Sequence, residues 1–406
     1  MINRRTAIKS LTVGGLTLLG SLSADKVLAR NHLNLPRYSW IFLYWIPYDN
    51  DLSYLGDAVM TMLKESIQTD NVLAIVQADF AQQPTLSRTI ISSSGVDSYF
   101  LDSEDSSDPE MFTALTDWAA QSYQADNWVV AFMGHGGRLT QISPDYNTGK
   151  SGSQQRNWME IIDIRDVILR FNQQTGQSLE LFFFQNCNKG TLEACNIMSP
   201  TANYILASQD LLGAPNYHYS NVFQFLGTAP NISGKQLAHR IREFETSDMY
   251  LGYTVVDCDR ISEITVALNT LIDSILQQPW EHLDLAQVPR IPYFGDTYVD
   301  IVIFLSTLSE QTQTEPVYLN NLVSLLEQVF EYLPNTDPLE FITFQRLYLT
   351  EPEIKPIIRY LESLSGLSVY LPESSEDLDR YVASGVYEGL NLPTLFNRLL
   401  HDGKLG

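Results

Sequence analysis

The chain has 406 residues, with 25 Lys and Arg against 48 Asp and Glu, and its formal net charge at pH 7 is −23. A charge of this sign repels phosphate backbones and anionic lipid surfaces, so we expect no nucleic-acid partner. Acidity of this size is typical of a soluble surface, although it also attracts cationic peptides and divalent cations. The length suits two or three domains, or one large α/β domain with additions.

The first thirty residues resemble an export signal more than a folded segment. Asn3-Arg4-Arg5-Thr6-Ala7-Ile8-Lys9 is similar to a twin-arginine signal, and an apolar stretch at 11–22 leads to the small-residue cleavage site Val27-Leu28-Ala29. That stretch is shorter than the ~20 residues that span a bilayer. We predict a signal peptide over residues 1–29, export to the periplasm or beyond, and no stable membrane insertion after its removal. The alternative is an amphipathic N-terminal helix or an uncleaved anchor.

Strand-like and helix-like segments alternate from Trp40 to about Cys258. Apolar runs of strand length occur at 41–46, 72–78, 128–133, 179–184 and 204–207. Helical patterns separate them, at 52–67, 108–123, 162–171 and 191–198, and polar segments at 102–107, 143–155 and 209–216 indicate loops. Strands separated by helices predict a three-layer α/β/α sandwich with a mostly parallel sheet.

The pattern changes after Cys258. Segments 259–277, 318–332 and 376–400 are mainly helical, with one strand-like run at 367–371. We therefore predict an α/β domain over residues 30–258 and an α-rich C-terminal region over residues 259–406 that packs on it.

Three cysteines remain after the predicted signal, at positions 187, 195 and 258. An odd number in an exported chain leaves at least one thiol free. Cys195 and Cys258 lie in apolar stretches, where a buried structural cysteine is usual. Cys187 differs because the apolar run at 179–184 leads directly into Gln185-Asn186-Cys187, and a thiol at a strand end is a candidate nucleophile.

A histidine occupies the matching place after another strand. The run at 128–133 leads into Gly134-His135-Gly136-Gly137, and a helical crossover joins it to the run before Cys187. The carboxyl ends of parallel strands meet at one sheet edge, so His135 and Cys187 are expected to face one crevice. An imidazole beside a thiol suits nucleophilic catalysis. The backbone N–H groups of Gly136 and Cys187 are candidate oxyanion donors, and the helix start near 191 is expected to favour the thiolate.

The residues around this pair resemble a known family. Gly134-His135-Gly136-Gly137 and Gln185-Asn186-Cys187-Asn188-Lys189-Gly190-Thr191-Leu192-Glu193 are similar to the His-Gly and Asp-Ala-Cys-x-x-Gly-Thr-Leu-Glu blocks of the clostripain family, relatives of caspases, gingipains and legumains. Further similar blocks are Asp49-Asn50-Asp51-Leu52, Ala207-Ser208-Gln209-Asp210, Tyr298-Val299-Asp300 and Gly366-Leu367-Ser368-Val369-Tyr370-Leu371-Pro372. The resemblance implies a caspase-like fold and a thiol endopeptidase acting on peptides or proteins, with Cys187 as nucleophile and His135 as general acid/base.

One departure from the family concerns specificity. Members that cut after Arg or Lys have Asp two residues before the nucleophile, and this chain has Gln185. Losing that charge pair removes ~1–3 kcal/mol of selectivity for basic side chains, although Asp210, beside Ser208 in the segment expected across the cleft, is a candidate substitute. Asn186, Asn188 and Lys189 are more polar than the family's usual neighbours of the nucleophile, and we expect them at the rim of the site.

Several features remain open at the level of sequence. The polar loop 143–155 contains Lys150, a candidate processing site, and relatives are activated by a cut in this interval. His218 is a candidate lining residue of the substrate groove. Relatives use calcium, but no EF-hand-like spacing occurs, so we assign no metal ligand. A catalytically silent peptide-binding relative is the alternative function, whereas an unrelated α/β hydrolase lacks support because no Gly-x-Ser-x-Gly elbow is present.

Overall fold

The computed structural model describes residues 35–147, 157–360 and 364–405. Residues 37–406 form one compact unit, and residues 1–36 are a separate unit. The predicted signal peptide and Lys150 therefore lie outside the described residues. In the described part of the chain, every helix is too short or too polar to cross a membrane.

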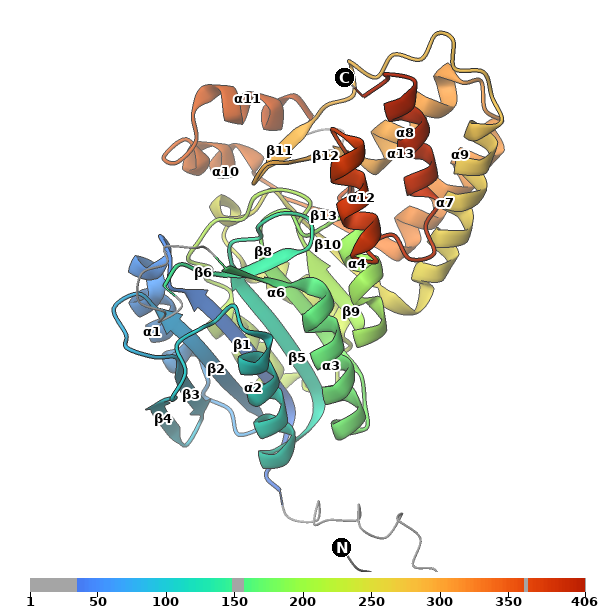
Figure 1. The fold of residues 1–406 in the computed structure, drawn as a ribbon. Coiled ribbons are helices and arrows are strands. Elements are labelled where there is room, and N and C mark those ends of the chain that lie inside the picture. Colours follow the sequence, from blue (N-terminus) through green and yellow to red (C-terminus); the bar gives the residue numbers. More distant parts are fainter. Residues whose placement is uncertain (1–34, 148–156, 361–363, 406) are drawn as a thin grey trace, which may run out of the picture. The chain divides into compact units, whose positions relative to one another are not determined.

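A nine-stranded sheet forms the centre of the unit described by residues 37–406 (Figure 1). In sheet order its strands are β13 (Phe330–Pro334), β10 (Gly252–Asp257), β9 (Ala202–Ala207), β8 (Leu179–Asn186), β5 (Gln124–Gly134), β1 (Arg37–Tyr48), β2 (Val72–Phe80), β3 (Ser87–Ser92) and β4 (Gly95–Phe100). The five strands from β9 to β2 pair in parallel, and the two strands at each edge pair antiparallel. The prediction of a mostly parallel sheet is confirmed.

Both faces of this sheet are covered, because alternate side chains of its central strands are apolar on each side. In β1, Ile41, Leu43 and Trp45 belong to one buried cluster, and the residues between them belong to another. The first face is covered by α2 (Pro109–Ser122), α3 (Ile161–Thr175) and α4 (Leu192–Met198), and the second by α1 (Gly56–Ser66), α5 (Tyr219–Thr228) and α6 (Gly234–Phe244). The predicted three-layer sandwich is confirmed.

Residues beyond 258 are mainly helical. Their helices are α7 (Ile261–Leu276), α8 (Ile301–Gln311), α9 (Pro316–Val329), α10 (Pro338–Gln345), α11 (Glu351–Tyr360), α12 (Ser375–Ala383) and α13 (Leu392–His401). A second sheet has the strand order β11 (Ile291–Tyr293), β12 (Asp296–Asp300), β14 (Ser368–Tyr370). One strand of this region, β13, pairs with β10 in the central sheet. Backbone hydrogen bonds therefore join the residues after 258 to the α/β sandwich. The division into two domains at that residue remains a prediction.

The order of the parallel strands reverses at β1, which has β2 on one side and β5 on the other. Ligands bind beyond the carboxyl ends of strands at such a switch point. A short hairpin of β6 (Gln141–Asp145) and β7 (Asn157–Glu160) lies at this edge, so the predicted loop at 143–155 begins inside a strand. Residues 148–156 of that loop lie outside the described residues.

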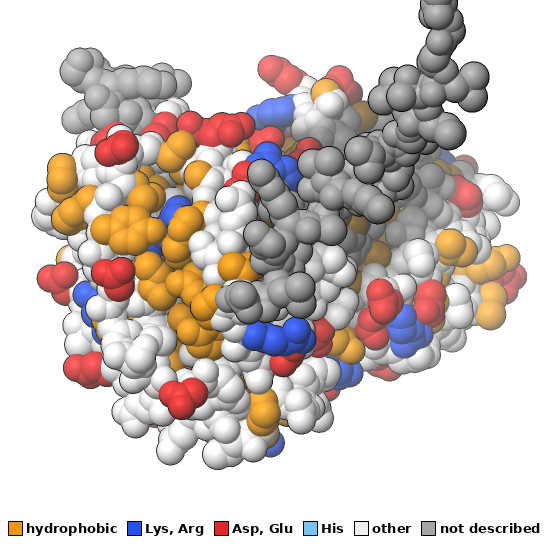
Figure 2. Space-filling model, turned by 90° about the horizontal axis from the view of Figure 1, so that it is seen from below, with side chains coloured by type: hydrophobic (Ala, Val, Ile, Leu, Met, Phe, Trp, Pro, Cys, Tyr) orange, Lys and Arg blue, Asp and Glu red, His pale blue; other side chains and the backbone are white. Residues whose placement is uncertain are grey.

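On the face shown in Figure 2, acidic side chains are spread among neutral and basic ones and do not form one patch. A dispersed charge of this kind fits a soluble surface, the first of the two interpretations of the acidity.

Candidate active site

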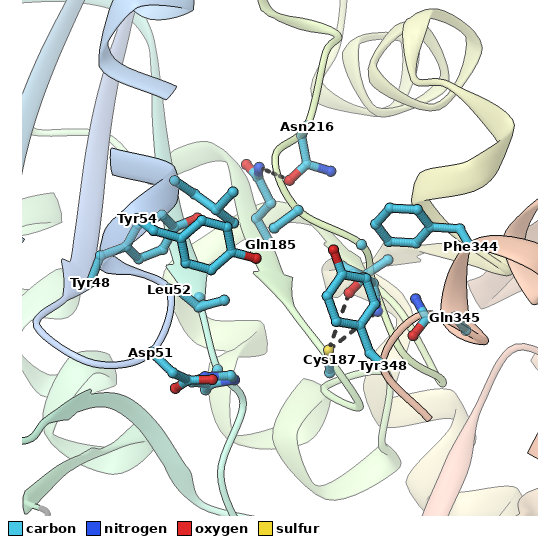
Figure 3. A pocket seen from close by; sticks show the side chains of 16 residues that line it. Tyr48, Asp51, Leu52, Tyr54, Gln185, Cys187, Asn216, Phe344, Gln345 and Tyr348 are labelled. Atoms are coloured by element: carbon cyan, nitrogen blue, oxygen red, sulfur yellow. Dashed lines mark hydrogen bonds and ion pairs between the residues drawn. The ribbon is translucent and has the colours of Figure 1, made fainter. Parts of the chain in front are cut away.

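His135 and Cys187 are brought together by the pairing of β5 with β8. In this parallel pair Met133 lies opposite Gln185, and Gly134 lies opposite Asn186. The next residue of each strand, His135 and Cys187, therefore leaves the sheet at the same level. Both line one cavity of about 430 Å³ at the carboxyl edge of the sheet (Figure 3).

The imidazole of His135 is held by a carboxylate from a third strand end. Its Nε2 lies 2.9 Å from Oδ1 of Asp51, which follows β1. Among the described residues, no hydrogen bond joins this imidazole to the thiol of Cys187. Sequence reasoning did not assign a role to Asp51, although it singled out the Asp-Asn-Asp-Leu turn that contains it. The contact leaves the imidazole positioned at the cavity but not engaged with the thiol.

The thiol of Cys187 is half-buried and accepts a hydrogen bond from the backbone N–H of Leu212 at 3.2 Å. Burial raises the pKa of Cys187, and hydrogen bonds from Leu212 and from the hydroxyl of Tyr293 only partly offset that effect. The expectation that the start of α4 favours the thiolate remains a prediction. The first turn of α4 is capped by its own Thr191, whose hydroxyl accepts from the N–H of Ala194. Burial favours the protonated form of the thiol in the resting site.

The polar neighbours of Cys187 tie its loop to the loop that carries His135. Nδ2 of Asn186 donates to the carbonyl oxygen of Gly134 at 2.8 Å. Nζ of Lys189 donates to the carbonyl oxygens of Arg138 at 2.6 Å and Leu139 at 3.2 Å, and burial lowers the Lys189 pKa to about 7. The prediction that these residues lie at the rim is wrong. Asn186, Asn188 and Lys189 are all buried, and Asn186 and Lys189 supply donors to carbonyl oxygens of the neighbouring loop.

Gly136 lies against the backbone of the nucleophile loop. A Cβ at this position would be 2.1 Å from the carbonyl oxygen of Cys187, so only glycine fits. The N–H of Gly136 donates to the hydroxyl oxygen of Tyr293 at 3.4 Å. The two backbone groups expected to bind an oxyanion, on Gly136 and Cys187, thus belong to loops in direct contact beside the thiol.

The cavity is mainly apolar and uncharged beyond the catalytic edge. Its lining comprises Tyr48, Asp51, Leu52, Tyr54, Leu55, Gly134, His135, Gln185, Cys187, Leu212, Gly213, Ala214, Asn216, Phe344, Gln345 and Tyr348. The amide of Gln185 is buried and its Nε2 donates to Oδ1 of Asn216 and to the hydroxyl of Tyr219, the latter at 3.0 Å. Within the described residues, the one carboxylate in this lining is that of Asp51, which contacts His135.

Two exposed tyrosines stand at the mouth of the cavity. Tyr54 comes from the short 3₁₀ turn before α1, and Tyr348 follows α10. Burial, followed by the nearby Tyr348, raises the pKa of Tyr54, and Figure 3 shows the two rings on either side of the opening. Segments almost 300 residues apart therefore frame one opening.

The other predicted substrate-binding residues lie outside this lining. The Ser208 hydroxyl is buried and donates to the carbonyl oxygen of Gly252 at 2.9 Å. Asp210 is also buried, which raises its pKa to about 6. Their backbone carbonyls accept hydrogen bonds from the N–H groups of Gly190 and Asn188, so this segment contacts the nucleophile loop. His218 is buried, with Nδ1 2.7 Å from Oε2 of Glu245.

Three buried carboxylates meet near the active site, on Asp49, Asp79 and Asp145, with oxygens within 4.8 Å of one another. Burial and the neighbouring carboxylates raise the Asp79 pKa to about 9. Oxygen ligands of this kind suit a hard cation such as Ca²⁺. Asn147, however, already donates to Asp49 and Asp145, and Ser106 also donates to Asp145. The cluster offers the type of ligand that calcium prefers, although these hydrogen bonds already engage some of its oxygens. Calcium binding is untested.

Several solved structures have a similar fold. A secreted C11 cysteine protease from Bacteroides thetaiotaomicron in complex with an irreversible peptide inhibitor has a TM-score of 0.59 and 16% identity, over 87% of this chain and 99% of that one. An inactive zymogen C11 protease from Parabacteroides distasonis has a TM-score of 0.59 and 16% identity, over 87% of this chain and 98% of that one. A secreted C11 cysteine protease from Bacteroides thetaiotaomicron, iotapain, has a TM-score of 0.61 and 11% identity, over 88% of this chain and 99% of that one. No curated protein matches the sequence.

The fold is thus that of the caspase-like C11 cysteine proteases. The model of the clostripain family matches residues 44–387, which is most of the chain. The chain belongs to the clostripain family and is a cysteine-type peptidase.

Proposed function

We propose that the chain is an exported endopeptidase that cleaves peptide bonds with Cys187 and His135 as its catalytic dyad. The observation that carries this proposal is the register of β5 and β8, which brings the two side chains to one cavity. The family supplies the class of reaction. The contact of His135 with Asp51 supports a third residue that orients the imidazole.

The reaction follows from these positions. When substrate is bound, Sγ of Cys187 passes its proton to the imidazole of His135 and attacks the carbonyl carbon of the scissile bond, and the carbonyl oxygen becomes an oxyanion near the N–H groups of Gly136 and Cys187. His135 delivers a proton to the leaving amine as the C–N bond breaks, which leaves a thioester on Cys187. Water then attacks the thioester, restoring the thiol and releasing the new carboxyl group.

The lining of the cavity supports a preference for uncharged P1 side chains. Gln185 occupies the place of the family's acidic residue, and its amide is engaged by Asn216 and Tyr219. Asp210, the other candidate for a negative charge, lies outside the lining. A P1 Arg or Lys would therefore lose its hydration without gaining a partner carboxylate other than Asp51.

Export is proposed from the twin-arginine-like residues at the N-terminus, and two of the similar structures are described as secreted proteases. Lys150 remains a candidate processing site. The supporting observation for a cut there is the sequence of the interval, since the residue lies outside the described part of the chain.

Replacement of the nucleophile tests the proposal. We expect Cys187→Ala to abolish cleavage of a random peptide library, while Cys195→Ala, at a buried position in α4, leaves turnover within about 2-fold because it is remote from the cavity. His135→Ala should lower kcat by at least ~10²-fold. Cleavage by Cys187→Ala would exclude the mechanism, and an inactive wild type that still binds peptides would favour the silent relative. The library also reports the P1 residue.

A further inference from the structure

A hairpin from the C-terminal region reaches the catalytic edge of the sheet. Strands β11 and β12 are joined by Phe294 and Gly295, which have φ angles of 50° and 83°, as a tight two-residue turn requires. The Phe294 ring lies 5.9 Å from the His135 ring and 5.4 Å from the Trp158 ring, measured between centroids. The tip of this hairpin therefore forms part of the surroundings of the dyad.

Tyr293, the last residue of β11, places its hydroxyl against one of the two groups that bind an oxyanion in the proposed reaction. The hydroxyl oxygen accepts the N–H of Gly136 at 3.4 Å. The same hydroxyl lies beside the thiol of Cys187, since an interaction between the two lowers the Cys187 pKa and raises that of Tyr293. An oxyanion on a carbon bonded to Sγ must lie beside these two groups, so the hydroxyl occupies the position of the substrate oxygen in the resting site.

The base of the hairpin is anchored, which limits how this hydroxyl can leave. Oδ2 of Asp296 accepts hydrogen bonds from the N–H of Leu139 at 2.8 Å, from the hydroxyl of Tyr381 at 2.6 Å and from that of Tyr298 at 3.3 Å. Asp296 is only 3% exposed, so these bonds are shielded from water. A substrate can therefore displace the hydroxyl by a small rotation of Tyr293, while the hairpin stays in place.

We propose that Tyr293 is a catalytic residue, a third oxyanion donor whose hydroxyl is displaced by the substrate oxygen and then donates to it. The inference rests on the proposed role of Cys187 as nucleophile. In the resting enzyme the hydroxyl accepts from Gly136 and donates to Sγ. When Sγ bonds to the carbonyl carbon, the new oxyanion takes the N–H of Gly136, and the O–H of Tyr293 turns from sulfur to this oxygen.

No proton is transferred from Tyr293 in this step. Burial and the neighbouring thiol hold its pKa well above the ordinary value, so the phenol remains a donor throughout the working pH range. The long 3.4 Å contact with Gly136 is weak and costs little to replace. A preorganised donor at a developing oxyanion contributes ~10²-fold to 10³-fold in kcat.

The opposite role is a plug that only blocks the oxyanion site. Tyr293→Phe distinguishes the two, because it removes the hydroxyl and keeps the ring. A third donor predicts a fall in kcat of ~10²-fold or more with KM changed by less than about 3-fold. It also predicts weaker inhibition by a peptide aldehyde, whose adduct with the thiol carries an oxyanion, by a similar factor. A plug predicts unchanged or higher kcat and tighter aldehyde binding, and either result would overturn the proposal.

Two controls complete the experiment. Tyr298→Phe removes a hydroxyl from the same hairpin, at its anchor, and should change kcat by no more than about 3-fold. Alkylation of Cys187 by iodoacetamide forms no oxyanion, so in Tyr293→Phe its rate should fall far less than kcat. Equal losses in alkylation and turnover would assign Tyr293 to thiol activation and refute the donor role. A failure of the dyad itself would appear separately, as cleavage by Cys187→Ala.

Discussion

The side chain two residues before the nucleophile decides the charge of the cavity. Gln185 is a buried residue near the end of β8, and its amide has partners in Asn216 and Tyr219. A carboxylate in the same place would be poorly hydrated, so it would attract a basic side chain strongly. The neutral amide is the basis of the proposed preference for uncharged P1 side chains.

Gln185→Asp therefore tests the origin of specificity. We expect the ratio of kcat/KM for Arg against an uncharged P1 residue to rise by about ten-fold or more, since a shielded charge pair is gained. The matched control is Gln185→Asn, which has the same shape as Asp without its charge and should leave the ratio unchanged. Peptide substrates that differ only at P1 measure both. A strong Arg preference in the unmutated enzyme would show that another carboxylate serves this cavity.

At the scale of elements, the site depends on two loops that follow neighbouring strands. The loop after β5 carries His135 and Gly136, and the loop after β8 carries Cys187. Asn186 and Lys189 donate to carbonyl oxygens of the first loop, and the segment at 208–210 accepts N–H groups of the second. Because each loop hydrogen-bonds to a neighbouring segment, the distance between imidazole and thiol is set by the backbone.

Asn186→Ala should loosen this connection. The variant loses the donor to the Gly134 carbonyl, and we expect kcat to fall about 10-fold with little change in KM, because the substrate cavity keeps its lining. The control is Asn188→Gly. The side-chain amide of Asn188 has no hydrogen-bond partner among the described residues, and the residue's φ of 55° suits glycine. Steady-state kinetics compare the two. Equal effects on kcat would contradict a positioning role specific to Asn186.

At the scale of the whole molecule, three of the many acidic side chains are buried together near the active site. Asp49 follows β1, Asp79 lies in β2 and Asp145 ends β6, so the folding of three strands brings three carboxylates together. Like charges in a buried site cannot all ionise without cost. The protein meets this cost by keeping Asp79 protonated, by holding a cation, or by losing stability.

The raised pKa of Asp79 predicts a pH-dependent stability. This carboxyl ionises near pH 4 in the unfolded chain and near 9 in the folded protein, so folding retains a proton between these values. The contribution of this carboxyl to the free energy of unfolding is complete below pH 4. It falls as the pH rises toward 9, by at most about 1.4 kcal/mol per pH unit. The Tm of Asp79→Asn should therefore exceed that of the wild type by a margin that grows from pH 5 to pH 8.

Thermal unfolding in EDTA measures this margin, with the exposed Asp166→Asn as a control whose margin should not depend on pH. A constant margin for Asp79→Asn would contradict the protonated carboxyl. Added CaCl2 provides the second arm. Stabilisation of the wild type by Ca²⁺ at pH 8, absent from Asp79→Asn, would show that the cluster binds the ion.

The central sheet was predictable because its parallel strands are continuous apolar runs. Strands buried on both faces must be apolar at every position, so β1, β2, β5, β8 and β9 are visible in the sequence. The antiparallel edges were not visible. All six residues of β4 are exposed, and β13 pairs with a strand about 75 residues earlier in the chain. Neither produces a local hydrophobic pattern.

The sequence by itself placed His135 and Cys187 at strand ends, since two apolar runs joined by a helical crossover end shortly before them, with one and two intervening residues. Only the tertiary structure decided their partners. Asp51 lies 84 residues from His135, and Tyr293 lies 157 residues from Gly136. The burial of Asn186 and Lys189 was equally undecidable, because it depends on which carbonyls the folded loops leave without donors. Periodicity reports local structure, whereas hydrogen bonds between distant segments depend on how the whole chain closes around the site.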